Sequence, residues 1–243
     1  MLWAMRPEPS FARSVVAWGN ACLRNELALE HFDTWWEKSG FVRVLSFRDS
    51  AEPAQSPATW LASQRAHGAT RLLLEASDYA GSERVIVCAE VPLAAWRQQW
   101  TRIAGATAPP WFDATFSREA APAVLPPPSR SPEEVLAELC AALEGLVALG
   151  TRANLEQWAS YFEDVLGVAR GERSQGTTPL PPTAPAVAHQ LALAANLSDV
   201  FGGMGSWNDF QPLADPVLED ERSRHSSALH AAIRAALAAT AHA

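Results

Sequence analysis

Apolar and polar positions near the start of the chain alternate with a helical period. Apolar side chains recur every three to four residues, which predicts an amphipathic helix with Phe11, Val15, Trp18 and Cys22 on one face. A shorter helix is expected around residues 32–36, which are rich in aromatic side chains. Together these segments form a helical arm at the N-terminus.

The following stretch has the composition of strands. Phe41 to Arg48 is rich in β-branched and aromatic residues and predicts a strand. Ser56-Pro57 supplies an N-cap and a proline at the first helical position, so a helix is expected to begin there. Thr70 to Ala76 and Arg84 to Val91 predict two more strands joined by a hairpin-like connection.

One more helix and one more strand are expected in this half. Trp96, Trp100 and Ile103 fall on one face of a helix, and Trp111 to Phe116 predicts a strand. The resulting order is β-α-β-β-α-β behind the helical arm. This is the order of a ferredoxin-like sheet.

A proline-rich segment separates the two halves. Four prolines lie among alanines and serines between Arg118 and Arg130, and consecutive prolines favour an extended chain over a packed element. We therefore expect an α+β domain over residues 1–120, a linker over 121–130 and a helical domain over 131–243.

Every segment after the linker has a helical period, apart from a second proline-rich stretch at residues 177–185 that predicts a long loop. Ser131 to Glu134 combines an N-cap, a proline at the first helical position and the glutamate of a capping box. Gly150 is expected to end this first helix. Three further amphipathic helices follow, and the fold class is α+β with an all-α four-helix bundle at the C-terminal end.

The run from Phe201 to Asp209 contains three glycines, a tryptophan and short polar side chains directly after an expected helix. One interpretation is structural: Gly202 caps the helix, and the next glycines let Trp207 fold back onto the bundle. The other is a binding loop for a small anion or a partner's side chain, in which backbone amides act together with three polar side chains. The loop residues in question are Gly202, Gly203, Gly205, Ser206, Trp207, Asn208 and Asp209.

This motif, together with the helices before it, resembles an uncharacterised bacterial domain family of unknown function. The resemblance rests on the sequence Phe-Gly-Gly-Met-Gly-Ser-x-Asn-Asp, on Gln157-Trp158-Ala159 and on the leucine-rich helix before them, and it covers roughly Leu136 to Phe210. It implies a helical fold and a bacterial origin, and no catalytic role. Small bacterial proteins of this general kind often accompany secreted toxins as immunity proteins.

Charge is distributed unevenly along the chain. The whole chain carries a formal charge of −8, and residues 121–243 hold 7 basic against 14 acidic side chains. A negative surface disfavours nucleic-acid binding and attracts a basic protein partner. No membrane-spanning run and no secretory signal is recognisable, so a cytoplasmic location and no membrane partner are expected.

No set of reactive side chains with catalytic or metal-ligand spacing stands out in the sequence. His225 and His230 are five residues apart, which places them on different sides of a helix. The three cysteines, an odd number, fall in expected apolar positions and are expected to be reduced. We expect no catalytic residue, no metal and no cofactor.

These observations favour a non-enzymatic bacterial protein-binding protein, such as an immunity protein that neutralises a basic toxin domain. Asp209, Glu219, Asp220 and Glu221 are the expected electrostatic contacts. Most of the ten tryptophans are expected in the core, and the alternative is that one or two of those in the N-terminal half are exposed anchors for a partner. The alternative is a small-ligand-binding or hydrolytic module that uses the loop from Gly202 to Asp209. The oligomeric state stays open.

Overall fold

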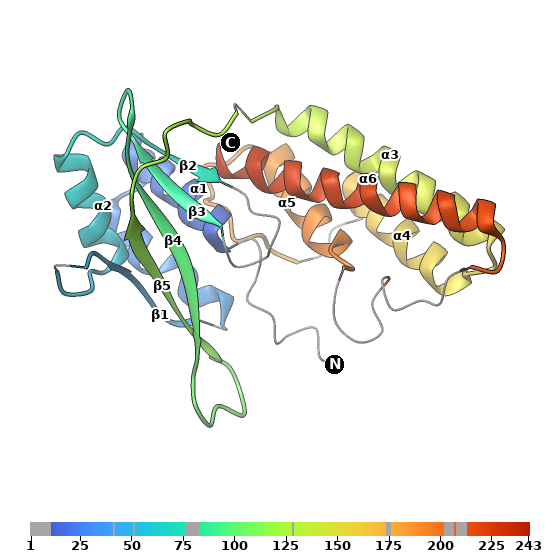
Figure 1. Ribbon diagram of the computed structural model, residues 1–243, viewed down its shortest axis with the longest axis horizontal. Coiled ribbons are helices and arrows are strands. Elements are labelled where there is room, and N and C mark those ends of the chain that lie inside the picture. Colours follow the sequence, from blue (N-terminus) through green and yellow to red (C-terminus); the bar gives the residue numbers. More distant parts are fainter. Residues whose placement is uncertain are drawn as a thin grey trace.

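The protein folds into a sheet layer and a helical layer that lie side by side (Figure 1). The structure is a computed structural model, and it describes residues 11–40, 42–50, 52–75, 83–127, 129–173, 176–201, 207 and 213–243. The fold class is α+β, as the sequence predicts. None of the helices in these described ranges combines the length and apolar character needed to cross a membrane.

The sheet layer contains one five-stranded mixed sheet. Its helices are α1 (Phe11–Leu23), the 3₁₀ helices η2 (Leu29–Asp33) and η3 (Trp35–Ser39), and α2 (Pro57–Ala66). Its strands are β1 (Val42–Arg48), β2 (Arg71–Glu75), β3 (Arg84–Cys88), β4 (Pro92–Arg102) and β5 (Phe112–Glu119). The strand order is β1-β5-β4-β3-β2, with β1 parallel to β5 and every other neighbour antiparallel.

The helix expected around Trp96 and Trp100 is a strand, and this changes the topology. Residues four apart share a face in a strand as well as in a helix, so the two tryptophans fit both periods. In β4, Trp96 and the buried Gln98 face the helices, while Arg97 lies on the other face. The second crossover helix of a ferredoxin-like fold is therefore missing, and β4 and β5 form a long hairpin in its place.

Aromatic rings fill the space between the sheet and its helices. The ring centroids of Phe47 and Trp60 are 3.8 Å apart with planes at 9°, and Trp96 meets Trp60 edge-on at 5.5 Å. All three side chains are at most 3% exposed. Of the nine described tryptophans, four are buried, namely Trp35, Trp60, Trp96 and Trp207, and the other five are half-buried. None of the nine is exposed as the anchor for a partner that the alternative expects, and Trp3 lies outside the described residues.

Side chains from α1 and from the end of α6 form hydrogen bonds with the free backbone groups along the outer edge of strand β2. Asn20 of α1 accepts a hydrogen bond from Leu72 N at 2.7 Å and donates one to Leu72 O at 3.0 Å. Gly19 allows this approach, because a Cβ atom at that position would overlap Leu72 Cδ1. Further along, Leu74 N donates to His242 Nε2 at 3.2 Å.

The helical layer consists of α3 (Pro132–Arg152), α4 (Glu156–Ala169), α5 (Ala186–Ser198) and α6 (Pro216–Ala241), which share one apolar core. The capping box at Ser131 and Glu134 is present, as expected. Gly150, however, does not end α3. It lies buried in the helix where α4 crosses, and a Cβ atom there would come within 3.1 Å of the Ala159 backbone. The left-handed residue after the helix is Asn154, with φ of 55°.

The C-terminal helix connects the two layers. Leu237 and Ala241 near the end of α6 belong to the apolar core beneath the sheet, whereas the middle of α6 packs on α3 and α5. Figure 1 shows α6 running from the outer end of the helical layer to the edge of the sheet near β2. The domain boundaries at residues 120 and 131 stay predictions, and α6 contributes side chains to the cores of both layers.

Candidate functional site

Most of the glycine-rich loop lies outside the described residues. This holds for Gly202, Gly203, Gly205, Ser206, Asn208 and Asp209, so their proposed binding role stays a prediction. Helix α5 ends at Ser198 with Asp199 as its C-cap, so Gly202 is not the residue that caps it, contrary to the structural interpretation of the loop.

Trp207 is the one residue of the glycine-rich segment after Phe201 with a described position, and it packs back onto the helices as expected. Its side chain is 1% exposed and meets both Trp158 and Phe162 edge-on, with ring centroids 5.2 Å apart in each case. Its indole N–H donates to Ser226 Oγ at 2.7 Å. This arrangement satisfies both the apolar body and the polar end of the tryptophan. It assigns Trp207 a role in packing α4 against α6.

The three acidic residues at the start of α6 differ in their availability to a partner. Glu219 forms an ion pair with Arg222 and accepts a hydrogen bond from Leu213 N, and these contacts lower its pKa. Glu221 forms an ion pair with Arg152 of α3. Asp220 is exposed and has no such partner among the described residues. Of the expected electrostatic contacts that the structure describes, only Asp220 presents an uncompensated charge, and Asp209 lies outside the described residues.

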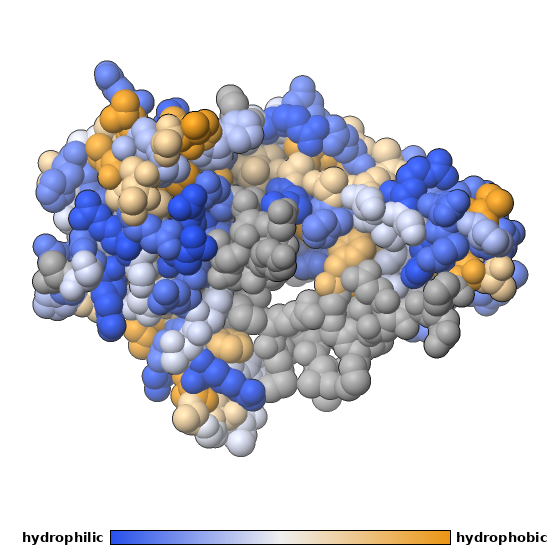
Figure 2. All heavy atoms as spheres, viewed as in Figure 1, coloured by the Kyte–Doolittle hydropathy of each residue, from blue (hydrophilic) through white to orange (hydrophobic). Residues whose placement is uncertain are grey.

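The rest of the helical layer shows the same excess of carboxylates. Five of the seven arginines after residue 120 already form ion pairs with carboxylates. On the exposed side of α4, Glu156 and Glu163 are two helical turns apart and have no ion-pair or hydrogen-bond partner in the described part of the chain. Hydrophilic side chains also gather at the outer end of the helical layer (Figure 2). Exposed negative charge therefore remains on α4 and at the start of α6.

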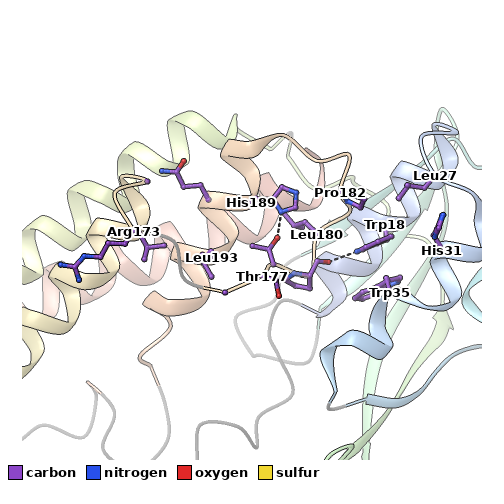
Figure 3. A pocket seen from close by; sticks show the side chains of 16 residues that line it. Trp18, Leu27, His31, Trp35, Arg173, Thr177, Leu180, Pro182, His189 and Leu193 are labelled. Carbon is purple, nitrogen blue, oxygen red and sulfur yellow. Dashed lines mark hydrogen bonds between the residues drawn. The ribbon is translucent and has the colours of Figure 1, made fainter.

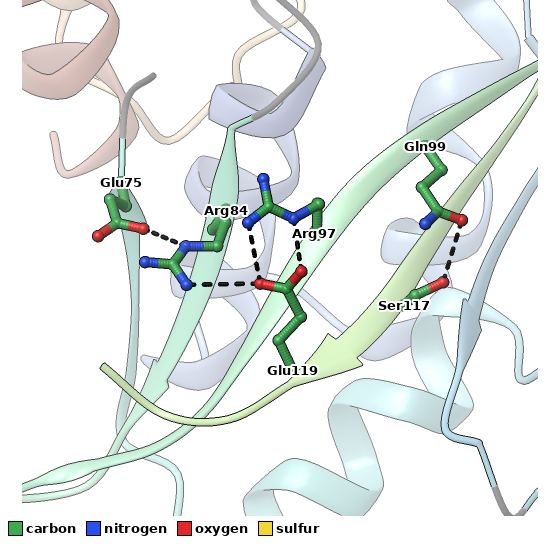
Figure 4. A network of polar contacts seen from close by, with 6 residues as sticks. All are labelled: Glu75, Arg84, Arg97, Gln99, Ser117 and Glu119. Atoms are coloured by element: carbon green, nitrogen blue, oxygen red, sulfur yellow. Dashed lines mark hydrogen bonds and ion pairs between the residues drawn. The ribbon is translucent and has the colours of Figure 1, made fainter. Parts of the chain in front are cut away.

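The outer face of the sheet, in contrast, balances its charges. Arg84 of β3 forms ion pairs with Glu75 of β2 and with Glu119 of β5, and Arg97 of β4 binds the same Glu119 through two nitrogens (Figure 4). The two guanidinium groups lower the pKa of Glu119. The network connects four strands, and it leaves little net charge for a partner.

No catalytic grouping is found among the described residues. The Cys22 thiol is buried and its pKa is raised to about 11, chiefly by desolvation, so it stays protonated and unreactive at neutral pH. Burial also raises the pKa values of Cys88 and Cys140. Within the described ranges, no three His, Cys, Asp or Glu side chains lie close enough to hold a metal ion.

A cleft of about 1100 Å³ lies between the two layers, and the sequence patterns gave no sign of it. Trp18 and Trp35 form one wall, stacked at 5.9 Å with planes at 12°. Segment 176–182 and α5 form the opposite wall, including Leu180 and Leu193 (Figure 3). The indole N–H of Trp18 donates to the Pro179 carbonyl at 2.8 Å, which fixes the proline-rich segment against α1.

A few polar side chains lie along this mostly apolar cleft. His189 Nδ1 is hydrogen-bonded to the Thr178 hydroxyl, and Arg173 lies at one end, where it also pairs with Asp164 (Figure 3). His31 lies at the other end, beside the two tryptophans. Apolar walls with a small number of polar groups are typical of ligand sites, which often form between domains.

Sequence reasoning missed the cleft because its walls are distant along the chain. Trp18 and Pro179, which hydrogen-bond across it, are 161 residues apart. The sequence placed the proline-rich loop at residues 177–185 correctly between two helices, but nothing in that loop indicates a cleft. Comparisons with family models, curated proteins and solved structures find no match to this chain.

Proposed function

We propose that this chain is a non-enzymatic, cytoplasmic bacterial protein that binds another protein, in the manner of an immunity protein occluding a basic toxin domain. The observation that carries the proposal is the uncompensated negative charge on the helical layer. In the proposal this layer acts as a four-helix bundle that holds the carboxylates in fixed positions.

The exposed side of α4 is the proposed centre of the contact. Glu156 and Glu163 project from the same side of a helix whose opposite side is buried through Phe162 and Val165. Asp220 at the start of α6 adds a third unpaired carboxylate. Because most nearby arginines are already paired, a partner must supply the positive charge. Complementary charge of this kind speeds association and excludes other acidic proteins.

The experiment measures binding to the purified product of the adjacent gene, together with growth protection when the two genes are co-expressed. We expect a one-to-one complex whose affinity falls at least tenfold when the salt concentration rises from 50 to 300 mM, because exposed charges are screened. The double variant Glu156→Gln/Glu163→Gln should weaken the complex about threefold to tenfold at low salt, mostly by slowing association.

The matched control is Glu37→Gln/Glu90→Gln, which removes two exposed carboxylates from the sheet layer. It changes the net charge equally and should leave affinity within about twofold if the contact lies on α4. Absence of binding and of protection would refute the function. Equal weakening by both double variants would refute the assignment to α4.

A further inference from the structure

We propose that the cleft between the layers binds an amphipathic organic anion, that is, a molecule with an apolar chain or ring body and a carboxylate or phosphate head. This site uses residues other than the α4 carboxylates and is independent of the proposed protein contact.

The charged side chains of the lining indicate the sign of the ligand's charge. The chain holds 27 acidic and 19 basic side chains, yet none of the residues that the structure describes around the cleft is an aspartate or glutamate. The ionisable side chains that line it are Arg173, His31 and His189. Nearby carboxylates exist outside the lining: Asp164 pairs with Arg173, and Glu30 precedes His31 in the sequence. A lining with hydrogen-bond donors, one arginine and no described carboxylate, in an otherwise acidic protein, favours an anion over a cation.

The walls of the cleft indicate that the rest of the ligand is apolar and elongated. Apolar side chains from both layers line the middle of the cleft, among them Trp18, Leu180 and Leu193. Arg173 and His31 lie at opposite ends in Figure 3, so the cleft is elongated and suits a molecule with its head at one end. Its volume of about 1100 Å³ accommodates a ligand of drug-like size or larger.

An unsatisfied donor supports the same assignment. Trp35 lines the cleft and is 5% exposed, and its indole N–H has no hydrogen-bond acceptor within the part of the chain that the structure describes. A buried donor without an acceptor is unfavourable, and an oxygen atom of a ligand can remove that cost after a small movement of the ring. Trp18, by comparison, satisfies its N–H with the Pro179 carbonyl.

The experiment titrates the full chain with dodecanoate, dodecyl phosphate and dodecyltrimethylammonium by calorimetry, below the concentrations at which they form micelles. We expect saturable one-to-one binding of at least one of the two anions, at least tenfold tighter than the cation of equal chain length. The two anions distinguish a carboxylate from a phosphate head. No saturable binding of either anion at 1 mM, or equal binding of the cation, would overturn the proposal.

Four variants locate the site. Thr177→Trp places a large ring on an exposed lining residue and should abolish binding, whereas Thr183→Trp on the same segment, outside the lining, should not. Arg173→Gln should weaken the anion about fivefold, because it removes a charge-assisted contact. Asp164→Asn releases Arg173 from its ion pair and should tighten binding. Unchanged affinity in Thr177→Trp with an unchanged thermal midpoint would place the anion elsewhere and overturn the assignment.

Discussion

His242 should make the protein less stable in mild acid. It follows the last turn of α6, is largely buried, and accepts a hydrogen bond from Leu74 N through Nε2. Its pKa falls from 6.5 to about 4, first because burial disfavours the charged ring and second because Arg71 is nearby. A protonated Nε2 cannot accept the Leu74 hydrogen bond, so protonation also breaks the contact between α6 and β2.

The sign and size of the effect follow from this difference in pKa. The unfolded chain takes up the proton near pH 6.5, and the folded chain takes it up only near pH 4, so the unfolded state binds more protons in between. The neutral histidine contributes its full stability above pH 6.5, and this contribution is lost as the pH falls towards 4. One pKa unit corresponds to about 1.4 kcal/mol, so the loss between pH 7 and pH 4.5 is about 2 kcal/mol.

Urea unfolding followed by circular dichroism at pH 7 and pH 4.5 measures the effect. The comparison is between the wild type and His242→Gln, whose side-chain oxygen can still accept from Leu74 N and does not titrate. The pKa values of carboxylates such as Glu119 and Glu219 are lowered in the folded state, so their protonation in acid also destabilises the protein. This destabilisation is the same in the wild type and in the variant. The wild type should lose about 2 kcal/mol more than the variant. Losses that agree within about 0.5 kcal/mol would refute the buried, neutral state of His242.

Two further predictions concern the helical layer. Trp207→Ala should lower the free energy of unfolding by about 3–5 kcal/mol in urea melts, while Trp207→Phe, which keeps the ring packing and loses the bond to Ser226, should cost about 1–2 kcal/mol; a loss below about 1 kcal/mol for the alanine variant would contradict the buried position. Gly150→Ala should lower the thermal midpoint, since the added methyl group meets the rigid backbone of α4 and costs about 1–3 kcal/mol despite the better helix propensity. Gly145→Ala, whose methyl group meets the movable ring of His225, should cost less, and the reverse order would be inconsistent with this packing.

The sequence predicted the elements with local signals and failed where two periods coincide. The cap of α2 at Ser56 and the capping box of α3 are read from a few adjacent residues, and both are present. Trp96 and Trp100 are consistent with a helix and a strand alike, and the choice depends on pairing with β3 and β5, which are distant in sequence. Gly150 was misread for a similar reason. A glycine that admits a neighbouring helix looks the same in sequence as one that ends its own helix.

For the candidate sites, too, the features that depend on local sequence were predictable, and those that depend on distant contacts were not. The placement of Trp207 against the helices was predictable, because a large aromatic residue after flexible glycines has an apolar surface to bury. The pairing of Glu219 and Glu221 was not predicted: Arg222 is close in sequence, but Arg152 belongs to another helix. The cleft depends on contacts between both halves of the chain, and no pattern within either half indicates it.

The covering of β2 limits how this protein can associate with itself. An open sheet edge is a template for intermolecular strand pairing and aggregation. At β2 that template is blocked by Asn20 and His242, and at β1 a two-way hydrogen-bonded bridge between Phe47 and Gln55 occupies part of the other edge. The end of α6 therefore hinders strand pairing with another molecule and also connects the two layers. Removal of its last few residues would uncover Leu74 N and leave that part of the β2 edge open to strand pairing with another chain.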